Sequence, residues 1–222
     1  MNKTYIQGKA IIFDMDGVIT DTMPYHYRAW KIILQREGIH ATKEDIYLRE
    51  GQPGKQTVKE IFRLYRKPLS FKKTKEMLDA KEIYFKKIVQ KGFIRGSRSF
   101  IKKMAKKNFL LALVTGTSRR EVKRILPGEL YDSFLVIITG DEVRYGKPHP
   151  EPYLKALKKL KINPGEAIVI ENAPFGIESA KAAGLRCVTL ETSLSKTYLK
   201  KADFIFSSFK NFVKHIEFQK IL

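Results

Sequence analysis

The chain has 222 residues, 43% of them hydrophobic, which is enough for one large core or for a core with a small second domain. No apolar run is long enough to span a bilayer, and no secretory hydrophobic region follows Met1, so the sequence predicts a cytoplasmic protein. The single cysteine, Cys187, excludes an intramolecular disulfide and lies in an apolar run, as a core residue would.

The net charge of +20 has two interpretations. Nucleic-acid binding is one, but the lysines are spread over expected helical surfaces and no nucleic-acid-binding motif is present. The other is a diffuse positive field that attracts small anionic substrates. We therefore expect a small anionic partner, no specific nucleic acid and no membrane.

The first expected element is a buried strand at residues 11–13, which ends in Asp14, Asp16 and Gly17. A bend at Gly17 brings both carboxylates to the carboxyl end of the strand, where open α/β sheets bind ligands. Two carboxylates this close repel, which predicts a bound cation or a raised pKa. The alternatives are a solvated turn, which would not need both acids, and a calcium loop, which would want an oxygen ligand at Val18.

The next segment is expected to be entirely helical. Apolar periodicity predicts helices over residues 24–38, 43–50, 56–65 and 70–89, with turns at 51–54 and 67–68. About seventy residues without a strand thus separate the first strand from the next one.

From about residue 93 the pattern changes to alternating helix and strand. Short apolar strands are predicted at residues 110–114, 134–138, 167–170, 186–190 and 203–206. Strands separated by amphipathic helices indicate a parallel sheet with right-handed crossovers. The helical segment is then either an elaborate loop of one α/β domain or a domain of its own.

Four segments, in chain order, resemble the motifs of the haloacid dehalogenase superfamily, close to its β-phosphoglucomutase and phosphoglycolate phosphatase branch. They are residues 14–22, 111–117, 146–150 and 168–176. The resemblance implies a Rossmannoid α/β core formed by residues 1–22 and 93–222. It also implies an all-helical C1-type cap over residues 23–92, hinged near 18–23 and 92–96.

The resemblance also assigns catalytic roles. Asp14 is expected to attack phosphorus and form an aspartyl-phosphate, and Asp16 to act as general acid and base. Thr115, Gly116 and Lys147 are expected to bind the phosphoryl group, Thr115 and Lys147 as part of the catalytic set. A helix cap is the alternative for the threonine, although Thr117 or Ser118 would fill that position more naturally.

For the metal, the resemblance implies Mg²⁺ held by Asp14, Asp16, Glu171 and Asn172. Most relatives have two acids after this strand, whereas here Glu171 is followed by a neutral amide. Since an amide oxygen brings no negative charge, we expect a lower Mg²⁺ affinity than in a two-acid site.

Two cap residues are candidate substrate contacts. His26 follows the first motif much as in this branch, although such a histidine is as readily packed or solvated. A mutase of this branch binds the second phosphate of its substrate with a cation of the cap. Gly54 stands at the position expected for the mutase arginine, and Lys55 is the nearest cation in the sequence. His149 has no metal-ligand partner at a suitable spacing and is interpreted as a loop residue.

The leading hypothesis is therefore a Mg²⁺-dependent phosphatase of a small sugar, polyol or glycolate-type phosphomonoester, present as a monomer or weak dimer. The alternative is a mutase of the β-phosphoglucomutase type, which would share every core residue. A third possibility is a non-enzymatic or nucleic-acid-binding protein that has kept the fold, but only Asn172 departs from the core motifs.

Overall fold

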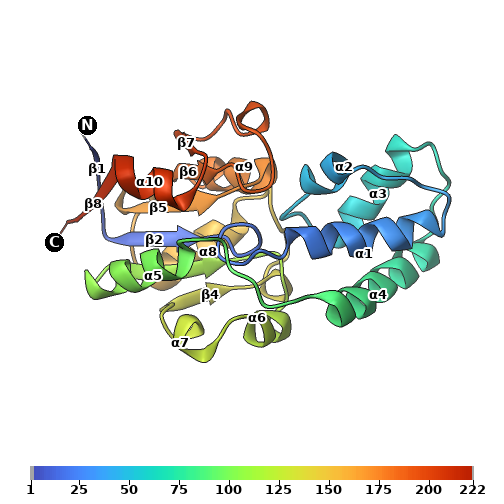
Figure 1. The fold of residues 1–222 in the computed structure, drawn as a ribbon, viewed down its shortest axis with the longest axis horizontal. Helices are drawn as coiled ribbons and strands as arrows, with labels where there is room; N and C mark the ends of the chain where they lie inside the picture. Colours follow the sequence, from blue (N-terminus) through green and yellow to red (C-terminus); the bar gives the residue numbers. More distant parts are fainter. Residues whose placement is uncertain (1–2, 222) are drawn as a thin grey trace.

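The computed structural model describes residues 3–221. Figure 1 shows a sheet flanked by helices and, beside it, a separate group of helices α1 to α4. Within the described residues, no helix is both long and apolar enough to cross a membrane.

The sheet has six strands, all parallel, in the order β4-β3-β2-β5-β6-β7. The fold class predicted from the sequence is confirmed. The chain moves outward from β2 in one direction through β3 and β4 and in the other through β5 to β7, so the strand order reverses at β2. Ligands bind at such a switch point. The strands are β2 (Ala10–Phe13), β3 (Leu110–Val114), β4 (Val136–Ile138), β5 (Ala167–Glu171), β6 (Arg186–Leu190) and β7 (Phe204–Phe206).

Helices cover the sheet, and β2 is buried completely between two apolar layers. Ala10 and Ile12 pack into one layer, Ile11 and Phe13 into the other, as alternation along a strand requires. Cys187 is buried in the first layer. The core helices are α5 (Ser97–Lys106), α6 (Arg119–Ile125), α7 (Gly128–Tyr131), α8 (Glu151–Leu160), α9 (Pro174–Ala182) and α10 (Phe209–His215), with 3₁₀ turns at Gly140–Glu142, Pro164–Glu166 and Lys196–Tyr198.

The cap consists of α1 (Met23–Gln35), α2 (Lys43–Tyr47), α3 (Gly54–Leu64) and α4 (Phe71–Ile88). All four helices were expected, but the helix predicted over 43–50 ends three residues early, because the chain turns toward Gly51, whose φ is +81°. Arg49 and Glu50 therefore lie in a loop that faces the core.

The chain passes between core and cap twice, and the two passages are hydrogen-bonded to each other. Asp21 N–H donates to the Gly92 carbonyl at 3.0 Å, and Ile94 N–H donates to the Ile19 carbonyl at 3.0 Å. These are the segments expected to act as a hinge, and the motion itself stays a prediction.

A small second sheet was not predicted. In it β1 (Thr4–Gly8) pairs in parallel with β8 (Ile216–Lys220), so the two ends of the described chain lie side by side (Figure 1). The first strand expected from the sequence begins at residue 11. The pairing joins segments from opposite ends of the chain, which local pattern alone does not connect.

Phe212, on α10, lies in an aromatic cluster with Phe100 and Phe218 at centroid distances of 5.2 and 5.8 Å and is fully buried. We expect Phe212→Ala to lower the free energy of unfolding by about 3–5 kcal/mol, because it leaves a cavity. Phe71 is 79% exposed, so Phe71→Ala is the matched control, with an expected change within about 0.5 kcal/mol. Urea denaturation measures both, and equal effects would contradict the assignment of this cluster to the core.

Candidate active site

The two aspartates follow β2 and are placed by a tight turn. Asp14 N–H continues the sheet by donating to the Ile170 carbonyl at 3.0 Å, and Gly17 N–H donates to the Thr20 carbonyl at 2.8 Å. Gly17 has a φ of +83°, and a Cβ there would stand 2.2 Å from Asn172 Nδ2. The bend predicted at this glycine is therefore present, and no larger residue fits it.

Lys147 connects the ends of three strands. Its Nζ donates to Asp14 Oδ1 at 2.7 Å, to Glu171 Oε1 at 2.6 Å and to the Val114 carbonyl at 3.2 Å, and the residue is 2% exposed. Burial alone would lower its pKa, but the two carboxylates hold the pKa of Lys147 above its ordinary value. The ammonium therefore stays charged beside the predicted nucleophile.

Glu171 is held in place on both of its oxygens. Tyr153 donates its hydroxyl to Oε1 at 2.8 Å, and the main-chain N–H of Asn172 donates to Oε2 at 3.0 Å. A Cβ on Gly176 would lie 1.9 Å from Oε1, so this glycine provides the space for the carboxylate. Glu171 thus orients Lys147, and Tyr153 orients Glu171. Tyr153 was not among the residues expected from the sequence.

Asp16 is surrounded by donors. Thr22 Oγ1 donates to Oδ1 at 2.5 Å, Thr117 Oγ1 donates to Oδ2 at 2.9 Å, and His26 Nε2 lies 3.4 Å from Oδ1. Burial raises the pKa of Asp16, but the hydrogen bonds from His26, Thr22 and Thr117 outweigh it and lower that pKa to about 2. By contrast, burial raises the pKa of Asp14 to about 8 despite the opposing charge of Lys147.

His26 is part of a hydrogen-bonded row that runs from the cap to Asp16. Its ring stacks on Phe85 at 4.2 Å, and its Nδ1 lies 3.0 Å from Nζ of Lys81 on α4. A lysine ammonium has only donors, so Nδ1 accepts and Nε2–H donates to Asp16. Burial lowers the pKa of Lys81 to about 8 and, together with the Lys81 charge, lowers the pKa of His26. Sequence alone gave no reason to single out Lys81.

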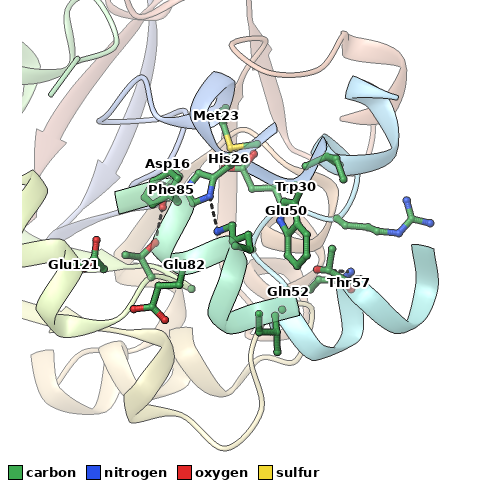
Figure 2. A pocket seen from close by; sticks show the side chains of 18 of the residues that line it. Asp16, Met23, His26, Trp30, Glu50, Gln52, Thr57, Glu82, Phe85 and Glu121 are labelled. Atoms are coloured by element: carbon green, nitrogen blue, oxygen red, sulfur yellow. Dashed lines mark hydrogen bonds and ion pairs between the residues drawn. The ribbon is translucent and has the colours of Figure 1, made fainter. Parts of the chain in front are cut away.

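A cavity of about 330 Å³ lies between cap and core beside Asp14 and Asp16 (Figure 2). Its apolar side comes from the cap, so that a substrate held here would be partly removed from water. The main cap residues that line it are Met23, His26, Trp30, Glu50, Gln52, Thr57, Lys81 and Phe85.

Thr115 and Gly116 lie where the sequence analysis expected them, after β3. Both line a second cavity of about 190 Å³ together with Lys147. Thr115 Oγ1 lies 3.5 Å from Asp16 Oδ2 and accepts from Thr117 N–H at 3.1 Å. The cap of α6 is Ser118, whose Oγ accepts from Glu121 N–H, so Thr117 is free to contact Asp16.

The structure corrects the expectation for Lys55. This lysine is exposed, and its Nζ lies 5.9 Å from the ring centroid of Phe71 rather than at the cavity. Gly54 and Thr57, three residues apart, share the helix face that lines the cavity, and Lys55 lies on another face. His149 is a loop residue, as expected, and its Nδ1 accepts from Glu151 N–H.

Among the described residues, three buried oxygens near the aspartates have no hydrogen-bond partner: Asp14 Oδ2, Asn172 Oδ1 and Glu50 Oε1. No group of three or more His, Cys, Asp or Glu side chains within residues 3–221 is arranged to hold a metal by itself. Hard divalent cations typically bind a mixed set of carboxylate, amide and main-chain carbonyl oxygens. The open oxygens of Asp14 and Asn172 are suitable members of such a set.

Residues 11–190 match the model of the family described as haloacid dehalogenase-like hydrolase. The chain belongs to this family. All four motif segments identified in the sequence fall within the match, so the predicted resemblance is confirmed, and the chain is an enzyme of this hydrolase family.

Several members of the family are similar over most of the chain. A phosphorylated carbohydrates phosphatase of Thermotoga maritima is 32% identical over 80% of this chain and 82% of its own. A fructose-1-phosphate phosphatase of Escherichia coli is 28% identical, with coverage of 83% and 97%. The crystal structure of a β-phosphoglucomutase from Clostridium difficile superimposes with a TM-score of 0.79 at 28% identity, covering 90% of this chain and 91% of that one.

The space beneath Glu171 gives a direct test of this geometry. We expect Gly176→Ala to destabilise the protein by about 1–3 kcal/mol, because the new methyl overlaps the Glu171 carboxylate. Gly165 has no neighbour within 4 Å of an added Cβ and no positive φ, so Gly165→Ala is the control and should change stability by less than about 0.5 kcal/mol. Chemical denaturation of both variants measures the difference. A neutral Gly176→Ala would contradict the placement of Glu171.

Proposed function

We propose that the protein is a Mg²⁺-dependent phosphatase that hydrolyses a small phosphomonoester through a phosphorylated Asp14. The observation that carries the proposal is the buried Lys147, which pairs with Asp14 Oδ1 and leaves Asp14 Oδ2 open beside a cavity. The similarity to enzymes named as phosphatases of phosphorylated carbohydrates and of fructose-1-phosphate supports a sugar or polyol phosphate as substrate. The cytoplasmic location and the oligomeric state stay predictions.

The residues present fit Mg²⁺. Asp14 Oδ2, the main-chain carbonyl of Asp16 and Asn172 Oδ1 are the groups that would hold it, because these side-chain oxygens are buried without a partner. When bound, the ion would offset the charge repulsion between the nucleophile and the phosphoryl group, and it would keep Asp14 ionised although burial raises its pKa. Glu171, predicted as a ligand, has both oxygens occupied by protein donors, so we place it beside the metal as the partner of Lys147.

The phosphoryl group is proposed to lie between Asp14 and the β3 loop. Lys147 and Thr115 would donate to its oxygens, and Gly116 leaves room for its approach. In the first step a carboxylate oxygen of Asp14 attacks phosphorus, and the bond to the leaving alkoxide breaks. In the second step water attacks phosphorus and releases phosphate and Asp14.

Asp16 is proposed to handle the proton in both steps. Its pKa of about 2 keeps it ionised before the reaction, so it is ready to accept a proton from water. Protonating the leaving alkoxide requires a proton at Asp16 first. Lys81 can deliver it through His26, by donating to Nδ1 while Nε2–H passes to Asp16, and the proton that Asp16 takes from water in the second step returns to Lys81 along the same path.

A phosphomutase of the β-phosphoglucomutase type is the second candidate, favoured by the overall similarity to the Clostridium difficile enzyme. A mutase has to hold a second phosphate in the cap. Lys55 points away from the cavity, and Arg49, which lines it, is engaged by Glu60 Oε2 at 3.2 Å and by the Asp45 carbonyl at 2.7 Å. Glu50 adds a carboxylate to the same cavity. These contacts favour the phosphatase.

A panel of phosphomonoesters with Mg²⁺, scored for both free phosphate and isomerised product, tests the proposal. We expect free phosphate from the wild type and a loss of at least about a thousandfold in kcat for Asp14→Asn, which removes the nucleophile. Asp79→Asn, on the exposed side of α4, is the control with the same chemical change. Isomerised product without net phosphate release would favour the mutase, and no turnover on any ester would overturn both.

The pH dependence tests the proton path. Because burial lowers the pKa of Lys81 to about 8, its ammonium carries the proton below that pH and is neutral above it. We expect kcat to fall as the pH rises through about 8, and Lys81→Met to show a lower kcat without this decline. Lys87→Met, exposed on the same helix, is the control and should keep the wild-type profile. A decline that persists in Lys81→Met would contradict the path.

A further inference from the structure

Glu50 is a half-buried acid that lines the cavity and has no role in the proposed mechanism. Glu50 belongs to the cap, yet its Oε2 lies 3.4 Å from Asn172 Nδ2 on the core, and its Oε1 is inaccessible to solvent and without a partner. Asn172 is the neutral residue that stands where the family resemblance implies a second acid. The position of the missing carboxylate on the core is thus contacted by a carboxylate from the cap.

The loop that carries Glu50 packs closely against the core. A Cβ on Gly51 would be 3.1 Å from Lys147 Cδ, and a Cβ on Gly146 would be 3.0 Å from Pro53 Cγ. On the cap side Gln52 Nε2 donates to Thr57 Oγ1 at 3.2 Å. Glu50 is therefore held at the site by its neighbours in sequence and is not a free surface side chain.

The charges around Glu50 are unbalanced. Glu50 shares this region with the carboxylates of Asp14, Asp16 and Glu171, and Lys147 is the cation that opposes them. That lysine already donates to Asp14 and Glu171. Three open oxygens, on Asp14, Asn172 and Glu50, remain in the same buried region. A divalent cation would satisfy both the excess negative charge and the open oxygens.

We propose that Glu50 supplies from the cap the negative charge that Asn172 does not provide, so that the divalent cation binds more tightly when the cap loop lies on the core. The inference rests on the metal site of the proposed function, and it adds a residue from the cap to that site. Since coupling between two equilibria is reciprocal, the metal must favour the closed position of the loop by the same factor.

Mg²⁺ affinity, measured by isothermal titration calorimetry without substrate, tests whether Glu50 strengthens binding of the cation. We expect Glu50→Gln to weaken binding about tenfold, within the range usual for coupled sites. Glu82 lines the same cavity, but its side chain is 55% exposed and pairs with Lys86, so Glu82→Gln is the matched control and should bind Mg²⁺ as the wild type does.

A double variant distinguishes charge from other effects. Glu50→Gln with Asn172→Asp moves the carboxylate from the cap to the core, and we expect it to regain affinity to within about threefold of the wild type, because a carboxylate is again available to the ion. Glu50→Asp keeps the charge on a shorter side chain and should lie between the wild type and Glu50→Gln. Thermal unfolding in the presence of a chelator checks that each variant is folded.

Amide hydrogen exchange of residues 48–54 tests whether Mg²⁺ favours the closed position of the cap loop. Mg²⁺ should slow exchange of this loop in the wild type, and the double variant should lose that protection, because its carboxylate no longer comes from the cap. Wild-type affinity in Glu50→Gln, equal weakening in Glu82→Gln, or a loop indifferent to Mg²⁺ would each overturn the inference. Hydrolysis of p-nitrophenyl phosphate at saturating Mg²⁺ distinguishes the two proposals. If the enzyme turns over but Mg²⁺ binding does not depend on Glu50, only the role of Glu50 is wrong. If Mg²⁺ binding depends on Glu50 but no ester is hydrolysed, the proposed function is wrong.

Discussion

The site depends on one buried ammonium. Lys147 is withdrawn from water, and such burial is tolerated only because Asp14 and Glu171 accept from it at 2.7 and 2.6 Å. The contacts fix the relative positions of β2, β5 and the loop before α8, and Tyr153 and Gly176 fix Glu171 in turn. Removing any one partner would leave another charge buried and unpaired.

Two carboxylates separated by one residue acquire different properties from their surroundings. Asp14 faces the buried ion pair, where removal from water raises its pKa to about 8. Asp16 receives donors from Thr22, Thr117 and His26, which lower its pKa to about 2. The nucleophilic role proposed for Asp14 requires its ionised form, which a divalent cation at Asp14 Oδ2 would favour.

The cap contributes side chains to the site. His26 contacts Asp16, Lys81 contacts His26, and Glu50 contacts Asn172, although each comes from a different part of the helical segment. Glycines at the contact surface, among them Gly51, Gly116 and Gly146, allow this close approach. Because groups on both sides of the interface serve one cavity, cap position and the properties of the site are physically linked.

The sequence by itself determined the parallel α/β core, the helical insertion and the position of Asp14 and Asp16 at a strand end, because apolar runs and their polar ends are local patterns that each strand carries alone. The roles expected of Thr115 and Lys147 came from the resemblance of their motifs to the family. Tertiary structure decided the rest. The β1–β8 pair joins distant segments, Lys55 points away because of its helix phase, and the partners Glu50, Lys81 and Tyr153 are brought to the site from elements that show no local signal. Such contacts depend on how elements pack, and spacing along the chain does not encode them.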